Sequence, residues 1–336
     1  MLGSRKIQVS YTLYMKYLLF RKKMDCYTLG ENYKPVMNAK ITNTRRVCML
    51  VNPKELLKDA QQNNYAIAGI NATTLEGIQA VIEAAEEVGA PIMLSHAQVH
   101  DPYAPIDTFG PLLAAFAEKA KIPVVLHLDH GTQYSYILKA IRYGFNSIMY
   151  DCSNLPVEEN IAKVKAFTES AHDLGIIIEA EVGMMPSNIV GMGGCTEYGK
   201  SIDNIEQYYT DPELAAYFCK ETKIDMLAAS FGTVHGFFVE KPVLDFERLK
   251  KIEEACGIPL VMHGTTGVDH VQIKRAIVEG VRKFNYFTGV ATAAALPVEE
   301  KIKNTKGTIY YHEIAECAKE AMKIQAKNML TLLRNT

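Results

Sequence analysis

After about residue 49, short apolar runs alternate with longer amphipathic segments, and the alternation repeats eight times. The apolar runs have the length of buried strands, and the segments between them have the length and period of helices. Strands that alternate with helices pair in parallel, because each crossover helix returns the chain to the start of the next strand. Eight units in about 250 residues predict a closed (β/α)8 barrel, or TIM barrel, rather than an open sheet.

The expected strands cover residues 65–70, 91–95, 123–128, 147–150, 176–182, 226–229, 259–262 and 283–285. The expected helices include 75–88, 111–120, 157–174, 212–221, 246–255 and 270–279, and a final helix over 311–333 is extra to the eight units. Residues 1–48 are basic and rich in tyrosine, and they lack a sustained period. We therefore expect an N-terminal extension over 1–48 and a barrel over 49–336.

Composition excludes several classes of partner. The net charge of −2 builds no field for nucleic acid or an anionic membrane, so any phosphate must be held by a local site. The chain has no apolar run of about 18 residues, which excludes a membrane-spanning helix. The seven cysteines are scattered, without a CxxC pair, as in a cytoplasmic protein with reduced thiols.

In a TIM barrel, function belongs at the C-terminal ends of the strands. Three histidines, each followed by glycine, stand at such ends: His130, His235 and His263. Three neutral imidazoles and one open position form a common catalytic zinc site. The pattern alone leaves a metal centre and a set of hydrogen-bonded histidines as alternatives. Further histidines compete for these roles, namely His96, His100 and His127, and His127 could face the interior as a core residue.

Acidic residues stand beside these histidines. Asp129 precedes His130, where it could orient a metal-bound imidazole or act as a general acid. Asp151 and Glu181 end the fourth and fifth strands, and Glu179 shares the inward parity of Glu181. Asp151 and Glu181 could hold a second cation or form ion pairs inside the barrel.

The last two strand ends read as phosphate-binding loops, because barrels often bind phosphate after strands seven and eight. Their small and hydroxyl-bearing residues are Gly264, Thr265 and Thr266 in one loop and Asn285, Tyr286, Phe287 and Thr288 in the other. None of the expected strand ends is a lysine. A Schiff-base mechanism needs a lysine inside the barrel, so this absence disfavours a lysine-dependent aldolase.

Several stretches resemble the class II, metal-dependent fructose-bisphosphate aldolases, especially the branch with tagatose-bisphosphate aldolases. They are Leu126-His127-Leu128-Asp129-His130-Gly131, Asp151-Cys152-Ser153-Asn154-Leu155-Pro156 with Glu158-Glu159-Asn160, Glu179-Ala180-Glu181-Val182-Gly183 and Gly232-Thr233-Val234-His235-Gly236. The resemblance runs from about residue 49 to the C-terminus and weakens after Thr288.

The resemblance implies zinc on His130, His235 and His263, with Asp129 as the catalytic acid. It places Asp151 and Glu181 near an accessory cation, and it implies substrate contacts for Asn71, Ser95, Gly236, Gly264, Thr265, Thr266, Asn285, Tyr286, Phe287 and Thr288. The implied reaction is the reversible cleavage of a ketose bisphosphate to dihydroxyacetone phosphate and an aldehyde. Fructose 1,6-bisphosphate, a glycolytic substrate, is expected, with tagatose bisphosphate or another ketose phosphate as the alternative. A homo-oligomer, either a dimer or a tetramer, is expected.

The chain departs from the family pattern in three loops. Thr265 is bulkier than the usual residue, and Phe287 and Gly289 replace a small or acidic residue and an acid. The loop over 184–200 lacks the family's paired acids, which leaves Glu197 as the candidate for the base. Two other functions are alternatives for a barrel of this kind. A metal-dependent hydrolase lacks its His-x-His pair and its bridging lysine here, whereas a non-catalytic barrel that binds sugar phosphate stays open.

Overall fold

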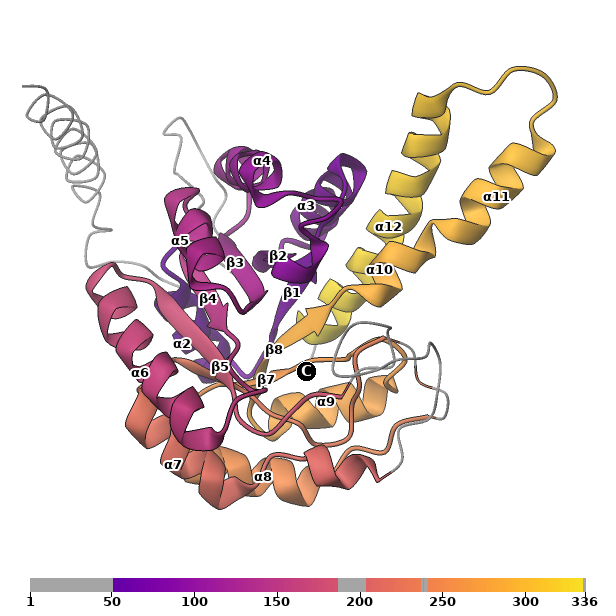
Figure 1. The fold of residues 1–336 in the computed structure, drawn as a ribbon. Coiled ribbons are helices and arrows are strands. Elements are labelled where there is room, and N and C mark those ends of the chain that lie inside the picture. Colours follow the sequence, from indigo (N-terminus) through magenta and orange to yellow (C-terminus); the bar gives the residue numbers. More distant parts are fainter. Residues whose placement is uncertain (1–50, 187–203, 237, 239–240, 335–336) are drawn as a thin grey trace, which may run out of the picture. The chain divides into compact units, whose positions relative to one another are not determined.

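The computed structural model describes residues 51–186, 204–236, 238 and 241–334, so the extension expected over 1–48 lies outside the described residues. Eight parallel strands form a closed barrel in sequence order, and β1 also pairs with β8 (Figure 1). The strands are β1 (Ile67–Asn71), β2 (Ile92–Ala97), β3 (Val124–Gly131), β4 (Ser147–Tyr150), β5 (Ile177–Glu181), β6 (Met226–Ala228), β7 (Leu260–Met262) and β8 (Val281–Tyr286). The predicted TIM barrel is confirmed.

Helices connect the strands and extend the chain at its C-terminal end. They are α2 (Pro53–Gln62), α3 (Leu75–Val88), α4 (Ile106–Lys119), α5 (Tyr134–Arg142), α6 (Val157–Asp173), α7 (Pro212–Thr222), α8 (Phe246–Cys256), α9 (His270–Val278), α10 (Thr288–Ala293), α11 (Ala295–Asn304) and α12 (Tyr311–Arg334). Two 3-10 turns are η1 (Gln98–His100) and η2 (Ile205–Tyr208).

Local chemistry sets where these helices start and stop. The Thr74 hydroxyl caps α3 by accepting a hydrogen bond from the Gly77 N–H at 3.0 Å. The helix ends at Gly89, whose φ of +66° is a left-handed conformation that glycine adopts without strain. Asp211 caps α7 in the same way, and Pro212 occupies the first turn, where its missing N–H costs nothing.

One expected helix start was wrong. The sequence places the start of α4 at Pro111, but the helix begins five residues earlier at Ile106, whose N–H donates to Asp101 Oδ1 at 3.0 Å. Pro111 therefore lies inside the helix, although proline is more usual in the first turn. Four helices lie outside the ranges named from the sequence, namely α2, α5, α10 and α11.

Helix α2 covers the N-terminal end of the barrel. Its buried side chains pack on the lowest layer of inward-facing strand residues, and this cluster comprises Leu56, Leu57, Ala60, Ile67, Met93, Val125, Met149, Ile177, Met226, Ala228 and Val261. Such a layer makes the interior a packed core rather than a pore. The opposite, C-terminal end is therefore left for the polar side chains at the strand ends.

Helix α12 joins the barrel through its second half. Its buried residues are Met322, Ala326, Met329, Leu330 and Leu333, and it packs mainly on α3. Lys323 and Lys327 of α12 pair with Glu87 of α3 at 3.5 Å and 2.7 Å. The structure gives α11 no buried residue.

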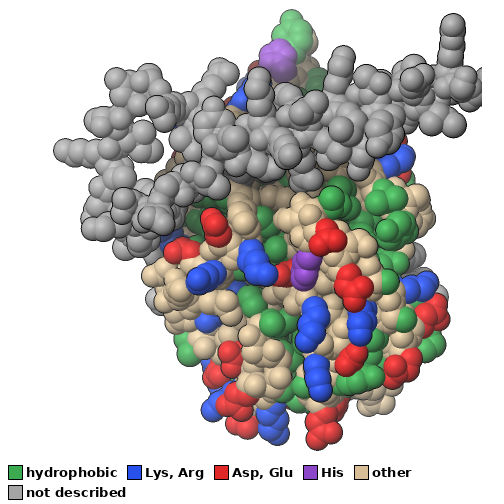
Figure 2. Space-filling view, turned by 90° about the vertical axis from the view of Figure 1, so that its left-hand side faces the viewer, with side chains coloured by type: hydrophobic (Ala, Val, Ile, Leu, Met, Phe, Trp, Pro, Cys, Tyr) green, Lys and Arg blue, Asp and Glu red, His purple; other side chains and the backbone are tan. Residues whose placement is uncertain are grey.

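No helix among the described residues is long and apolar enough to cross a membrane. On the face seen in Figure 2, acidic and basic side chains are interspersed over the barrel. This face has no broad field of one sign, so recognition of an anionic substrate there would depend on a local arrangement of polar groups.

Candidate metal centre and substrate site

Three imidazoles from different strands meet above the C-terminal end of the barrel. His130 lies on β3, His235 follows β6, and His263 follows β7 directly. His130 Nε2 is 3.1 Å from His263 Nδ1 and 3.3 Å from His235 Nε2, and the latter two atoms are 3.3 Å apart. Tetrahedral zinc with Zn–N bonds of about 2.05 Å separates its nitrogen ligands by about 3.3 Å. The three nitrogens thus fit one metal ion with almost no rearrangement.

The backbone of β3 turns both Asp129 and His130 toward this site. Neighbouring residues of a regular strand face opposite sides. Here the β3–β4 register shifts between Leu128 and Gly131, and His130 has a left-handed φ of +44°. A bulge of this kind re-aims a side chain, and the unusual φ marks a site that the surrounding structure holds in place. The sequence did not reveal this bulge.

The glycines after the histidines have a packing reason. A Cβ on Gly131 would lie 2.8 Å from Leu128 Cδ2 and 3.0 Å from Ile137. A Cβ on Gly264 would lie 2.2 Å from the carbonyl oxygen of Val234, next to His235. The backbones that carry two of the imidazoles can therefore approach closely only because residue 264 has no side chain.

Carboxylates hold two of the imidazoles through their other nitrogen. Asp151 Oδ2 is 2.7 Å from His130 Nδ1, and Glu179 Oε1 is 2.9 Å from His263 Nε2. Such contacts orient a ligating imidazole and select its tautomer. Burial by itself lowers the pKa of His130, but Asp129 and Asp151 raise it to about 10 without a metal. The pKa of His235 is lowered well below its ordinary value, chiefly by burial.

Asp129 lies beside the three histidines without orienting any of them. It accepts hydrogen bonds from the side-chain amides of Asn71 at 2.7 Å and Asn285 at 2.9 Å. Burial raises the pKa of Asp129, but the charges of His130 and His263 outweigh burial and hold it well below its usual range. The amide oxygens of Asn71 and Asn285 are buried and have no partner.

A second group of oxygen and nitrogen donors adjoins the first. His130, Asp151 and Glu181 each offer an atom, and these atoms lie within 4.8 Å of one another. Burial and the nearby Asp151 charge raise the pKa of Glu181 to about 8. Two close carboxylates in a buried place favour either a proton or a cation. The group therefore suits an accessory cation.

The expected phosphate loops lie together, although their side chains differ in orientation. The Thr265 hydroxyl is buried without a partner, and the Thr266 hydroxyl accepts from the Gly289 N–H at 3.0 Å, which joins the two loops. The Tyr286 hydroxyl instead contacts Gln325 of α12, on the outer side of the barrel. Phe287 lies against His100, with ring centroids 4.4 Å apart.

The remaining expected residues are placed as follows. The Ser95 hydroxyl donates to the Met93 carbonyl at 3.1 Å and is buried. Gly236 follows His235 with a φ of +100°, and Thr288 begins α10. His96 bonds to the Tyr136 hydroxyl at 2.9 Å, outside the imidazole cluster. Glu197, the candidate base, lies outside the described residues.

Sequence reasoning missed a charged residue inside the barrel. Lys283 of β8 is fully buried, and its Nζ is 2.6 Å from Glu179 Oε2 and 3.1 Å from His127 Nε2. The sequence argument considered only the strand ends, where no lysine stands, and it did not consider Lys283, which lies two residues before Asn285. The inward parity that Lys283 shares with Asn285 could have revealed it. His127 faces the interior, where it bonds Ser147 Oγ at 2.8 Å.

Known proteins share this fold and much of this sequence. The family model described as fructose-bisphosphate aldolase class-II matches residues 51–336. The uncharacterized protein YdjI of Escherichia coli K12 is 36% identical over 252 residues, which cover 75% of this chain and 87% of YdjI. The crystal structure of the YdjI aldolase superposes with a TM-score of 0.73 at 32% identity, and covers 84% of this chain and 97% of that one.

Two further solved structures are similar. One is a putative fructose-1,6-biphosphate aldolase from Coccidioides immitis, with a TM-score of 0.71 at 28% identity over 84% of this chain and 96% of that one. The other is the fructose-bisphosphate aldolase of Campylobacter jejuni, with a TM-score of 0.69 over 84% and 95%; at 24% identity it supports the fold alone. The family match over most of the chain, joined to the site described above, shows that this protein belongs to the class II fructose-bisphosphate aldolase family.

Proposed function

We propose that this protein is a zinc-dependent aldolase that reversibly cleaves a ketose phosphate to dihydroxyacetone phosphate and an aldehyde. His130, His235 and His263 would hold the metal, and fructose 1,6-bisphosphate is the first substrate to test. The observation that carries the proposal is the convergence of three imidazole nitrogens, 3.1–3.3 Å apart, beside the ionised carboxylate of Asp129. Family membership supports the reaction class.

Zinc would supply Lewis-acid polarisation of the substrate carbonyl, which acidifies the neighbouring carbon. The residues of the chain would handle protons and orientation. In the cleavage direction, Asp129 would accept the proton of the substrate hydroxyl, and its lowered pKa keeps it ionised for that step. In the condensation direction the same proton would return to the aldehyde oxygen. Asn71 and Asn285 would fix the carboxylate through their amide groups.

The loops after β7 and β8 are the proposed phosphate cradle. The unpartnered Thr265 hydroxyl can donate to a phosphate oxygen, and Gly264 lets its backbone approach. The hydrogen bond between Thr266 and Gly289 joins the two loops, so both move as one unit. Phe287 would form an apolar side of this phosphate cradle, and it packs against His100. Asp151 and Glu181 would hold an accessory cation beside His130.

The decisive experiment separates aldol chemistry from binding alone. Purified protein is stripped of metal with a chelator, and part of it is reloaded with zinc. Both forms are incubated with dihydroxyacetone phosphate that carries tritium at the hydroxymethyl carbon next to the carbonyl. Release of tritium by the zinc form and not by the stripped form is the expected result. Full exchange by metal-free protein would contradict zinc dependence. Binding without exchange would favour a non-catalytic sugar-phosphate-binding barrel.

The aldehyde partner is a separate question for this site. A panel of ketose mono- and bisphosphates, which includes fructose and tagatose 1,6-bisphosphates, is offered to the zinc form. We expect cleavage of at least one, with dihydroxyacetone phosphate as the common product. Equal rates with the two bisphosphates would show that the site does not read the stereochemistry of the new carbon–carbon bond.

A further inference from the structure

The interior of the barrel contains a buried polar chain beneath the imidazole cluster. It runs from Ser147 on β4 through His127, Lys283 and Glu179 to His263. None of these side chains is more than 1% exposed. Gly69 of β1 leaves room for the lysine side chain, because a Cβ at this position would lie 3.0 Å from Lys283 Cε.

The lysine determines the hydrogen-bond direction along this chain. An ammonium group can only donate, so His127 Nε2 must accept from Lys283. His127 Nδ1 then carries the proton and donates to Ser147 Oγ. On the other side, Lys283 donates to Glu179 Oε2, and its positive charge compensates that carboxylate. Glu179 can therefore act as an ionised acceptor for the His263 Nε2–H.

We propose that Lys283 is a positioning residue for the metal centre, which acts through Glu179 to keep His263 in the tautomer that presents Nδ1 to the metal. The inference rests on the proposed function, since it assumes that the three imidazoles bind zinc. His263 Nδ1 faces His130 Nε2 at 3.1 Å, where a lone pair is needed. Loss of the lysine removes the donor that holds Glu179 Oε2, so the carboxylate is no longer fixed in the orientation that aims Oε1 at the His263 Nε2–H.

The test compares Lys283→Met with wild-type protein. Methionine keeps the length of the stem and removes the charge. Zinc affinity is measured by competition with a chromogenic chelator, and the tautomer of His263 by nitrogen-15 spectra of the metal-free protein. We expect zinc affinity to fall about 10- to 100-fold, with a mixture of tautomers at His263. Ser147→Ala, at the far end of the same chain, is the control and should keep both properties.

A double variant covers the case in which Lys283→Met fails to fold. Lys283→Met with Glu179→Gln removes both charges of this buried pair, and the glutamine oxygen still accepts from His263 Nε2–H. Zinc affinity within about tenfold of wild type supports the proposal. Unchanged affinity and a single tautomer in Lys283→Met overturn it while the zinc aldolase stands. Failure of wild-type protein to bind zinc instead overturns the proposed function.

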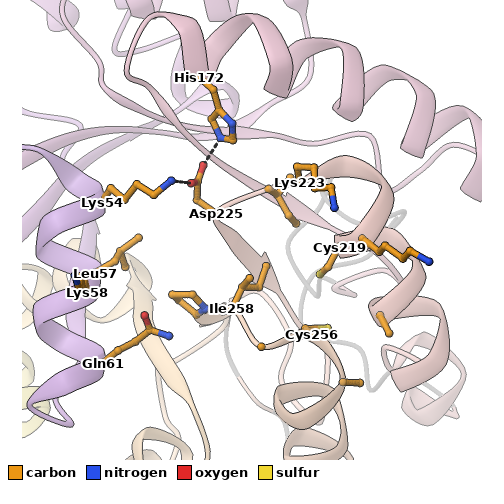
Figure 3. Close-up of a pocket in the computed structure, with 16 residues that line it drawn as sticks. Lys54, Leu57, Lys58, Gln61, His172, Cys219, Lys223, Asp225, Cys256 and Ile258 are labelled. Carbon is orange, nitrogen blue, oxygen red and sulfur yellow. Dashed lines mark hydrogen bonds and ion pairs between the residues drawn. The ribbon is translucent and has the colours of Figure 1, made fainter.

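A separate feature lies at the N-terminal end of the barrel. A cavity of about 590 Å³ opens between α2, α7 and α8, and Cys219 and Cys256 both line it (Figure 3). The two thiols come from neighbouring helices and are hydrogen-bonded to each other. Lys220 and Lys223 lie on the same lining. Asp225, its one carboxylate, is already bonded to His172 at 2.8 Å.

We also infer that Cys219 and Cys256 form a dithiol site for a two-electron oxidant such as hydrogen peroxide. The Cys256 thiolate attacks one peroxide oxygen and becomes a sulfenic acid, and the other oxygen leaves as water after taking up a proton. The Cys219 thiol then attacks that sulfur, a disulfide forms, and a second water leaves. The hydrogen bond with Cys219 lowers the pKa of Cys256 and outweighs burial and the Glu253 charge, which raise it.

The disulfide would join α7 to α8 and enclose the segment with β6 and His235. Zinc-loaded protein is treated with hydrogen peroxide and analysed by intact mass and peptide mapping. We expect a loss of about 2 Da and a Cys219–Cys256 cross-link. In Cys219→Ser, dimedone should label Cys256 faster than Cys317, a half-buried thiol on α12 that serves as the matched control. The absence of the cross-link, or equal labelling of Cys317, overturns the assignment.

Discussion

At the scale of single residues, the site depends on which nitrogen or oxygen each side chain presents. His130 offers Nε2 to the other imidazoles because Asp151 occupies its Nδ1, and His263 offers Nδ1 because Glu179 occupies its Nε2. Asp129 has neither task, since Asn71 and Asn285 hold it instead. This division leaves Asp129 available for proton transfer, and it makes the role testable apart from metal binding.

Substitution of Asp129 by alanine should separate proton transfer from metal binding. We expect turnover to fall on the order of 10³-fold, the scale of a lost general acid or base. Zinc content, measured by mass spectrometry of the metal, should stay at the wild-type level because Asp129 occupies neither nitrogen of any histidine in the cluster. Loss of zinc in parallel with activity would show that Asp129 is part of the metal site.

Two buried histidines on the β2 side should make stability depend on pH. Burial lowers the pKa of His96 and of His100 to about 4. In the unfolded chain the pKa of each histidine is about 6.5. Below this pH the unfolded chain binds protons that the native chain does not bind, so stability falls as the pH drops from 6.5 toward 4. At pH 5 each histidine costs about 2 kcal/mol.

Urea unfolding of His96→Gln across pH 5 to 7 checks this expectation. Glutamine can keep a hydrogen bond to Tyr136 without a titrating ring. The loss of stability at pH 5 should shrink by about 2 kcal/mol relative to wild type. His312→Gln, an exposed histidine on α12, is the matched control. An identical pH profile for His96→Gln and wild type would contradict the prediction.

At the scale of elements, the two loops after β7 and β8 and helix α2 should affect different properties of the protein. The loops after β7 and β8 are joined by the bond from Gly289 N–H to Thr266. Helix α2 closes the opposite end of the barrel with apolar side chains. The loops are proposed to bind substrate and α2 packs against the barrel, so substitutions in them should have separable effects.

Thr266→Val removes one hydroxyl from the joined loops with little change in shape. We expect KM for the ketose phosphate to rise about tenfold, the value of one hydrogen bond at the upper end of its usual range, with a smaller change in kcat. Thr305→Val removes a hydroxyl that bonds only to the backbone of α11 and should leave KM unchanged. A fall in kcat alone would place Thr266 with the chemistry instead.

Leu57→Ala cuts into the layer between α2 and the barrel. Leu57 is 3% exposed, so the cavity left behind should cost about 2–4 kcal/mol of unfolding free energy. The activity of the folded fraction should not change, because α2 lies at the end away from the histidines. Leu296→Ala on α11, where leucine is 70% exposed, is the control. Equal destabilisation by both changes would show that α2 is not packed as described.

At the scale of the whole molecule, the metal centre depends on closure of the barrel. His130 is 105 residues from His235 and 133 residues from His263 in sequence. The unfolded chain holds no such arrangement, so the proposed metal would bind mainly to the native state and its binding energy would add to folding. Stability and metal content are therefore linked.

Zinc removal should lower the melting temperature. With free zinc at about 1,000 times its dissociation constant, the native state gains about 4 kcal/mol, which corresponds to roughly 8 °C for a domain of this size. Thermal unfolding with and without a chelator measures the difference. His235→Gln, which removes one ligand, should melt at a temperature independent of zinc. An equal zinc effect in that variant would place the metal elsewhere.

The sequence was sufficient for the barrel and for much of the site. Strand and helix periods recurred eight times, and parallel pairing through crossover helices then leaves few topologies. The start of α4 was wrong because Pro111 reads as a first-turn residue, whereas a side-chain acceptor on Asp101 allowed the helix to begin earlier. Lys283 was overlooked because the sequence argument considered only the strand ends, and Lys283 lies two residues before the end of β8 that carries Asn285.

By itself, the sequence determined the period of the chain and the residue types at the strand ends, because both depend on local spacing. Only the tertiary structure decided which atom of each side chain contacts which partner. The bulge at His130 and the contact of Asp151 with its Nδ1 depend on the pairing of β3 with β4. The contact of Glu179 with His263 and the burial of Lys283 depend on strands far apart in sequence. Such contacts follow from closure of the barrel, which brings together residues that no local pattern relates.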